Sequence, residues 1–242
     1  KRTNNFNLQV KKMNFWIDRK VLITGAGGFI GSHLVERLVH EGAHVRAFVR
    51  YTSRSDTGLL LQLAPDLLAQ VELVAGDLRD QAAVRSAMSG IQTVLHLGAV
   101  IAIPYSYLHP VEVVETNVIG TLNVLSAGRE TGVERIVHTS TSEVYGTARY
   151  APIDEAHPLQ GQSPYSASKA ASDYLVRAYH HTYGLQVTTS NCSNNYGPWH
   201  FPEKLIPLCI VNILQGRPLP IYGDGRNIRD WLYVSGHCRG IE

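Results

Sequence analysis

The sequence lacks the features of membrane-spanning and disulfide-rich proteins. It contains only 3 cysteines, Cys192, Cys209 and Cys238, which form an odd, widely spaced set without the paired spacing of metal ligands. This pattern predicts reduced thiols in a cytoplasmic protein and no metal site. No uninterrupted apolar run approaches the ~20 residues that cross a bilayer, so we expect no membrane partner.

A strong charge of either sign is also absent. Charged residues make up 17% of the chain and the formal net charge is +2, so bulk electrostatics give no reason to expect nucleic acid as a partner. Hydrophobic residues make up 44%, which fits a globular protein with a sizeable core. Residues 1–12 are polar and basic and lack the apolar stretch of a secretory signal. We expect a leader or a cloning remnant there, with a basic interaction arm as the alternative.

Short apolar runs alternate with longer helical patterns along the chain. The expected strands are residues 20–24, 43–49, 71–75, 93–97, 135–138 and 185–190. The expected helices are residues 28–41, 111–131 and 164–183. This alternation predicts an α/β fold, a doubly wound parallel sheet with helices on both faces. After Cys192, proline and glycine become frequent, which predicts a smaller, loop-rich segment.

Three glycines follow the first expected strand. Gly25, Gly28 and Gly31 form a Gly-x-x-Gly-x-x-Gly pattern where that strand passes into a helix. Glycines there permit a tight turn and a close backbone approach to a pyrophosphate, and the helix amino terminus supplies free N–H groups. This context favours a dinucleotide site over the alternative, a purely structural turn.

The second expected strand ends in arginine where an acid would bind a ribose. An acid there favours the 2′-hydroxyl of NAD, and arginine accommodates the 2′-phosphate of NADP. Arg50 and the nearby Arg54 therefore leave NAD and NADP open and favour NADP. The alternatives are that both are solvated surface charges or that Arg50 stacks on adenine. Asp77, directly after the third expected strand, is placed to accept a hydrogen bond from the adenine amino group.

Tyr165 and Lys169 lie four residues apart in an expected helix, so their side chains share one face. A nearby ammonium is expected to lower the phenol pKa, and a phenolate can remove a proton from a sugar hydroxyl. Thr141, Ser142 and Glu143 follow an expected parallel strand, at the end that faces the ligand crevice. They could bind the sugar and handle a second proton; the alternative for Glu143 is a solvated loop acid.

Together these motifs resemble the extended short-chain dehydrogenase/reductase family, in its epimerase/dehydratase branch. The resemblance extends from Met13 to the end of the chain and also rests on residues 96–99, 117–121 and 139–146. Ser140–Gly146 is similar to nucleotide-sugar 4,6-dehydratases and decarboxylases, whereas 4-epimerases usually lack the glutamate. Residues 101–107 and 147–164 resemble UDP-N-acetylglucosamine 4,6-dehydratases. Residues 191–198, 201–207 and 229–234 resemble dTDP-glucose 4,6-dehydratases.

The resemblance implies a nucleotide-sugar 4,6-dehydratase whose substrate is a nucleotide-diphosphate sugar. Its reaction is oxidation at carbon 4, loss of water across carbons 5 and 6, and hydride return to carbon 6. NAD or NADP would stay tightly bound and be regenerated in each cycle. The alternatives are a nucleotide-sugar decarboxylase or epimerase of the same family and a cofactor-binding but inactive protein.

The resemblance also implies a Rossmann-like dinucleotide-binding domain over residues 13–192. Residues 193–242 would form a partial nucleotide-sugar-binding lobe, because family members continue beyond the position of Glu242. A homodimer is implied in which helices 111–131 and 164–183 pair across a two-fold axis. The alternative is that the apolar faces of these helices only cover the sheet.

Finally, the resemblance assigns roles to individual residues. Tyr165 is the base at the oxygen on carbon 4, Lys169 binds the nicotinamide ribose, Thr141 bonds the sugar oxygen, and Glu143 removes the proton on carbon 5. Ser142 stands where the dTDP-glucose enzymes carry aspartate. The further implied cofactor contacts are Phe29, Ile30, Leu78, Leu97, Ala99 and Asn195. The implied substrate contacts are Asn194 on the phosphates, Lys204, Leu205, Pro220, Ile221 and Tyr222 around the nucleotide, and Arg229 on the pyrophosphate, unless Arg229 pairs with Asp224 or Asp230.

Overall fold

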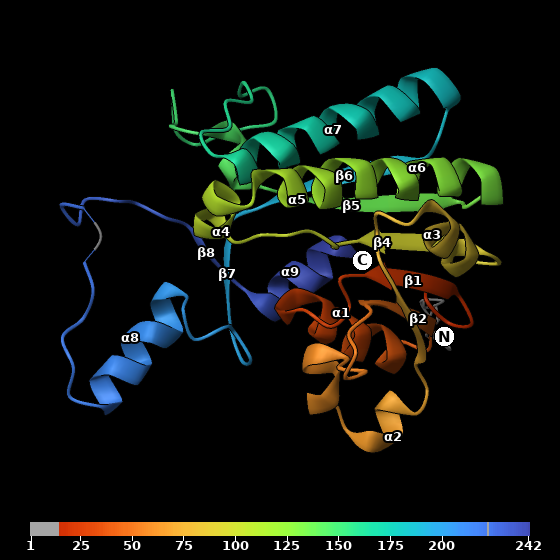
Figure 1. The fold of residues 1–242 in the computed structure, drawn as a ribbon, viewed down its shortest axis with the longest axis horizontal. Helices are drawn as coiled ribbons and strands as arrows, with labels where there is room; N and C mark the ends of the chain where they lie inside the picture. Colours follow the sequence, from red (N-terminus) through yellow and green to blue (C-terminus); the bar gives the residue numbers. More distant parts are fainter. Residues whose placement is uncertain (1–14, 222) are drawn as a thin grey trace, which may run out of the picture.

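A six-stranded parallel sheet forms the centre of the molecule (Figure 1). The computed structural model describes residues 15–221 and 223–242, so the expected leader over residues 1–12 and Tyr222 lie outside the described residues. The strands are β1 (Lys20–Thr24), β2 (His44–Arg50), β3 (Glu72–Gly76), β4 (Thr93–His96), β5 (Arg135–Thr141) and β6 (Val187–Cys192). Their order is β3-β2-β1-β4-β5-β6, so the chain builds the sheet from β1 out to β3 and then crosses back to β4 on the other side of β1. The predicted doubly wound parallel sheet is confirmed.

Strand β1 shows why the apolar runs become strands. Successive side chains of a strand point to opposite faces of the sheet. Val21 and Ile23 are buried in the core on one face, and Leu22 is buried in the core on the other. Because both faces are covered, consecutive positions must be apolar, and the run is continuous rather than alternating.

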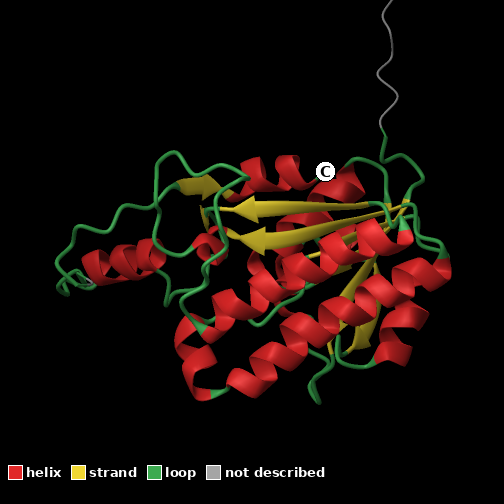
Figure 2. Ribbon diagram, turned by 90° about the horizontal axis from the view of Figure 1, so that it is seen from above, coloured by secondary structure: helices red, strands yellow, loops and turns green. Residues whose placement is uncertain are grey.

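Helices cover both faces of the sheet (Figure 2). On the face of Val21 lie α1 (Phe29–His40), the short helices η1 (Gly58–Gln62) and α2 (Pro65–Leu68), and α9 (Val234–Ile241). On the face of Leu22 lie α3 (Gln81–Met88), α6 (Gly120–Thr131) and α7 (Pro164–Tyr183). Helix α7 has the predicted bounds, because Ser163 and Ser166 form a capping box at its start and Gly184, at φ 69°, ends it.

The predicted helix over residues 111–131 is a continuous run with a π-helical turn in its middle. The run comprises α5 (Pro110–Val114), the π turn η2 (Glu115–Ile119) and α6, and α4 (Ile103–Leu108) precedes it. Asn117 lies buried in the π turn. Its amide nitrogen donates to the Val100 carbonyl (3.0 Å) and the Ser168 hydroxyl (2.9 Å), and its amide oxygen accepts from the Val100 nitrogen (2.8 Å). Asn117 thus fixes the loop after β4 against α7.

The segment after Cys192 contains more regular structure than the expected loops. Its elements are β7 (Asn194–Tyr196), α8 (Leu205–Leu214), β8 (Trp231–Tyr233) and α9, and β7 pairs with β8 in a small parallel sheet. The expectation of a loop-rich segment missed both helices, because Pro207 and Gly236 obscure their patterns. Helix α8 lies apart from the main sheet in both views (Figures 1 and 2).

Helix α9 returns to the main core. Val234, Cys238 and Ile241 are buried there with side chains of α1. Residues 234–241 therefore pack with the predicted dinucleotide-binding domain, although the predicted boundary at residue 192 places them in the second lobe. The division at residue 192 stays a prediction. Within the described ranges, no helix combines the length and the apolar character that a membrane span requires.

Candidate active site

The glycine turn after β1 has no room for a side chain at Gly25 or Gly31. Gly25 has φ +68°, and a Cβ added there would lie 2.9 Å from the Gly98 nitrogen. A Cβ on Gly31 would lie 2.2 Å from the Gly25 carbonyl oxygen. Gly28 is the N-cap of α1; no side chain caps the helix there and its first turn contains no acid. The first N–H groups of α1 are therefore available for an anion, so this cradle fits a pyrophosphate.

We expect Gly31→Ala to destabilise this turn and to weaken dinucleotide binding strongly. The added methyl group meets backbone atoms that cannot move aside, and overpacking of this kind costs about 1–3 kcal/mol. Calorimetric titration with NAD and thermal unfolding measure the two effects. Gly240→Ala is the matched control, because nothing lies within 4 Å of its added Cβ. Normal NAD affinity in Gly31→Ala would contradict a pyrophosphate cradle.

Charged residues surround the expected adenosine end of the site. The Asp77 carboxylate accepts from Arg79, at 3.0 Å from Nε and 2.7 Å from Nη2, and these bonds lower its pKa. Arg50 is exposed, and its Nη2 lies 3.3 Å from a Glu112 oxygen. The other Glu112 oxygen accepts from the Tyr105 hydroxyl at 2.5 Å. Glu112 of α5, an acid that sequence reasoning did not identify, thus lies beside Arg50 at the end of β2.

Tyr165 and Lys169 lie on the buried face of α7, as predicted, at 8% and 4% exposure. Burial raises the pKa of the Tyr165 phenol to about 12, and the hydrogen bond with Thr141 opposes this rise. Burial lowers the pKa of Lys169 to about 8, and its ammonium donates to the Thr139 carbonyl at 2.8 Å. The pKa of Tyr165 is thus raised by burial, opposite to the direction expected from a nearby ammonium.

The end of β5 brings the other predicted catalytic residues to this phenol. Thr141 bonds the Tyr165 hydroxyl, and its own hydroxyl also accepts from the Glu143 backbone nitrogen at 3.2 Å. Ser142 and Glu143 follow in the single turn η3 (Ser142–Tyr145). The Glu143 charge raises the pKa of the Tyr165 phenol. A phenol, a hydroxyl and a carboxylate therefore lie at one edge of the sheet.

The other predicted contacts lie on both sides of β6 in the chain. Asn195 lies near the phenol: its amide bonds the Cys192 thiol, and Cys192 also contributes to the raised pKa of Tyr165. Asn194 pairs in β7 with Trp231. Phe29, Ile30 and Leu97 pack against the first core cluster, Leu78 is buried in the second, and Ala99 lies half-buried after β4.

The more distant substrate contacts are not gathered around the phenol. Ile221 is 76% exposed, Leu205 is 40% exposed, and Pro220 lies in the same outer loop. Arg229 is exposed and donates to the Ile228 carbonyl, while Asp224 pairs with Arg226. Lys204, in contrast, lies with Arg50, Glu112 and Tyr105 around a cavity of about 760 Å³. This cavity joins the end of β2 to the start of α8.

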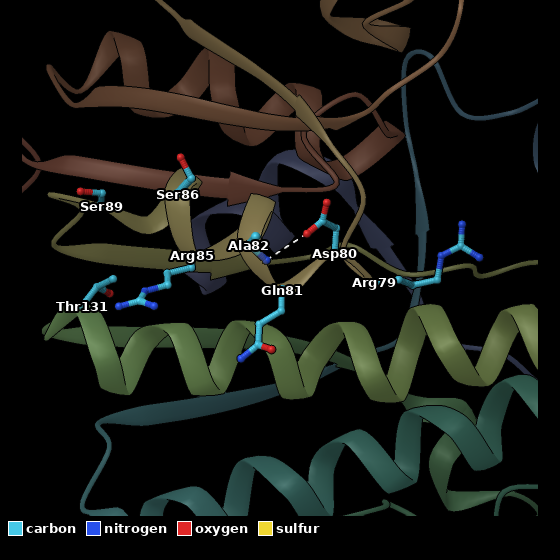
Figure 3. A pocket seen from close by; sticks show the side chains of 8 residues that line it. All are labelled: Arg79, Asp80, Gln81, Ala82, Arg85, Ser86, Ser89 and Thr131. Atoms are coloured by element: carbon cyan, nitrogen blue, oxygen red, sulfur yellow. Dashed lines mark hydrogen bonds between the residues drawn. The ribbon is translucent and has the colours of Figure 1, made fainter.

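A larger cavity of about 920 Å³ lies away from these residues, along α3 (Figure 3). Arg79, Arg85 and Ser86 are among its lining residues. The Asp80 carboxylate accepts from the Ala82 nitrogen at 2.9 Å and caps α3, so it is already engaged. None of the predicted catalytic residues lines this cavity.

Sequence reasoning missed a layer of buried polar side chains beneath Tyr165 and Lys169. His96, His138, Ser140 and Asp173 are each at most 5% exposed. His96 bonds Thr24 at 2.7 Å and Thr121 at 3.0 Å, and burial holds its pKa well below its usual range. A histidine or aspartate at a strand or helix position with apolar neighbours is the signal that could have identified this layer.

Fold and site together define a Rossmann-like α/β protein of the short-chain dehydrogenase/reductase type. Residues 22–242 match the family described as GDP-mannose 4,6 dehydratase, and the chain belongs to this family. It is 46% identical over 232 residues to dTDP-glucose 4,6-dehydratase of Xanthomonas campestris pv. campestris (strain B100), covering 91% of this chain. The chain spans 66% of the length of that relative.

Two solved structures are similar to this chain, and they differ in sequence identity more than in fold similarity. The crystal structure of dTDP-glucose 4,6-dehydratase from Streptomyces venezuelae with NAD and TYD bound is similar at 41% identity and a TM-score of 0.82. The similarity covers 91% of this chain and 70% of that one. UDP-N-acetylglucosamine 4-epimerase from Methanobrevibacter ruminantium M1 has a TM-score of 0.85 at 28% identity, covering 93% and 72%. The fold is thus shared with epimerases, while the sequence is more similar to the dehydratases.

Proposed function

We propose that this chain carries the catalytic part of an NAD-dependent nucleotide-sugar 4,6-dehydratase whose substrate is dTDP-glucose. The observation that carries the proposal is the meeting of Tyr165, Thr141 and Glu143 at the sheet edge that also holds the glycine turn. The names of the 46% identical relative and of the related structure support the substrate. NAD is favoured over NADP because Arg50 faces Glu112 and because the related structure holds NAD.

The site residues divide the chemistry among themselves. The turn at Gly25 and Gly28 and the start of α1 would hold the pyrophosphate. When bound, NAD supplies the acceptor and the later donor of a hydride. Tyr165 takes the proton from the oxygen on carbon 4, and Thr141 orients that oxygen.

Elimination then requires a proton to move from carbon 5 to the oxygen on carbon 6. Glu143 takes the first proton and can return it to the departing hydroxyl, which leaves as water. Ser142 has no proton to donate readily near neutral pH, so one carboxylate serves both atoms. This requires the two atoms to lie on one face of the sugar, within reach of Glu143.

Product analysis after incubation with dTDP-glucose tests the proposal. We expect a 4-keto-6-deoxy sugar nucleotide, lighter than the substrate by one water. Mass spectrometry of the co-purifying cofactor identifies NAD or NADP. Carbon dioxide released from a uronic-acid substrate would instead indicate a decarboxylase, and cofactor binding without turnover would indicate an inactive protein.

We also propose that the protein forms a homodimer through α4, α5 and α7. Exposed apolar side chains gather on these helices: Leu108 is 76% exposed, Val111 is 68% and Tyr174 is 57%. We expect Val111→Glu to halve the mass measured by light scattering at micromolar concentration, because a charge in an apolar interface loses its hydration. Leu214→Glu on α8 is the control and should leave the mass unchanged. A monomeric wild-type protein would contradict the dimer.

A further inference from the structure

Asp173 continues the buried ladder formed by Tyr165 and Lys169. The three residues stand at i, i+4 and i+8 of α7, so they lie above one another on one helix face. All three are buried, with Asp173 at 5% exposure. A buried carboxylate costs free energy unless polar groups or an opposite charge compensate it, and the buried Lys169 lies one helical turn away.

Neutral polar groups surround the Asp173 carboxylate. The Ser140 hydroxyl donates to Oδ2 at 2.7 Å, and the Asn191 amide bonds the same group. His138 Nε2 lies 3.3 Å from Oδ1. His138 is fully buried, and burial together with the Lys169 charge holds its pKa well below the usual range. His138 is therefore a neutral neighbour, and the carboxylate keeps its charge available for another partner.

The Asp173 charge acts on the ammonium group of Lys169. Burial lowers the lysine pKa, and Asp173 is the main charge that opposes the effect. The other groups facing Lys169 are neutral: His138 and His96 lie under it on β5 and β4, and burial raises the pKa of the Cys192 thiol on β6. The phenol of Tyr165 lies one turn earlier on α7, and burial raises its pKa to about 12.

We propose that Asp173 is a positioning residue whose buried carboxylate keeps the Lys169 amine protonated. The functional motif of Tyr165 and Lys169 thus extends one further helical turn to Asp173. The protonated state of Lys169 depends only on residues of this chain and not on the proposed reaction. Its catalytic consequence rests on the proposed function, in which an ammonium is needed beside the ribose and the phenol.

The test is a titration of the lysine side chains by NMR, with carbon-13 at the ε position. In wild type, the Lys169 signal should titrate near pH 8. In Asp173→Asn its midpoint should fall by about one pH unit or more, the usual effect of removing a nearby opposite charge. Ser172→Ala is the matched control, because it alters a buried side chain one position earlier and leaves the Asp173 charge in place. The Lys169 midpoint in Ser172→Ala should stay at the wild-type value. Asp173→Asn that folds with an unchanged midpoint would overturn the proposal.

A second measurement needs no variant. In the wild-type protein, the Asp173 carboxyl carbon should complete its titration below the Lys169 midpoint, because the two charges must coexist. Asp173 still protonated at pH 8 would overturn the proposal even if Asp173→Asn did not fold.

Activity separates this inference from the proposed function. The basic limb of the pH–rate profile should move to lower pH in Asp173→Asn, in step with the Lys169 midpoint. A shifted midpoint with an unmoved pH–rate profile would keep the charge assignment and reject the catalytic role of Lys169. A Lys169 midpoint that does not move in Asp173→Asn, together with a normal wild-type reaction, would reject the charge assignment and leave the proposed function standing.

Discussion

Tyr165→Phe should slow oxidation at carbon 4 by about 10²–10⁴-fold, the usual contribution of a general base. The substitution removes the hydroxyl that bonds Thr141 and leaves the aromatic ring in its buried place on α7. Cofactor affinity should be nearly unchanged, because the glycine turn lies on β1 and α1. Single-turnover absorbance of the reduced nicotinamide with dTDP-glucose measures the rate, and calorimetry with NAD measures the affinity.

Tyr145→Phe is the matched control for this prediction. Tyr145 is also 8% exposed and lies in η3 beside the site, where its ring packs edge-on to His157. It should retain a rate within a few-fold of wild type. Near-normal turnover in Tyr165→Phe, or equal losses in the two variants, would refute Tyr165 as the base.

The second large effect is expected at Glu143. Glu143→Gln should stop elimination while the first oxidation still occurs, because Tyr165 and Thr141 remain in place. The amide cannot take a proton from carbon 5, so the reaction should halt at the 4-keto sugar nucleotide. Absorbance of the reduced nicotinamide, followed beside product analysis, distinguishes the two steps. Loss of deuterium exchange at carbon 5 in heavy water provides an independent measurement.

Ser142→Ala is the control that tests the one-carboxylate mechanism. It changes the neighbouring residue of η3 and should do much less damage than Glu143→Gln, because serine is a poor acid near neutral pH. If Ser142→Ala proves as damaging as Glu143→Gln, the mechanism in which one carboxylate serves both atoms is wrong.

Local patterns were sufficient to predict most elements of the sheet and its long helices. The bounds of β1 and α7 match the prediction, because each is set by adjacent residues: an apolar run for β1, and Ser163, Pro164 and Gly184 for α7. The short helix α3 was missed although Asp80 caps it, because only three of its residues are buried and the apolar pattern is therefore short. Helix α9 was missed because Gly236 obscures its pattern, and its packing partner α1 is about 200 residues away in sequence.

The sequence by itself determined which groups are candidates for the chemistry: three glycines at a strand end, a tyrosine and lysine one helical turn apart, and a hydroxyl and carboxylate at the end of β5. Spacing along one strand or helix fixes such neighbours. Only the tertiary structure decided their charge states, since the pKa values of Tyr165 and Lys169 depend on burial under other elements. It also decided that Asp173 meets Ser140 and His138, and that Glu112 meets Arg50. These partners come from different strands and helices, and only the packing of the sheet brings them within a few ångströms of one another.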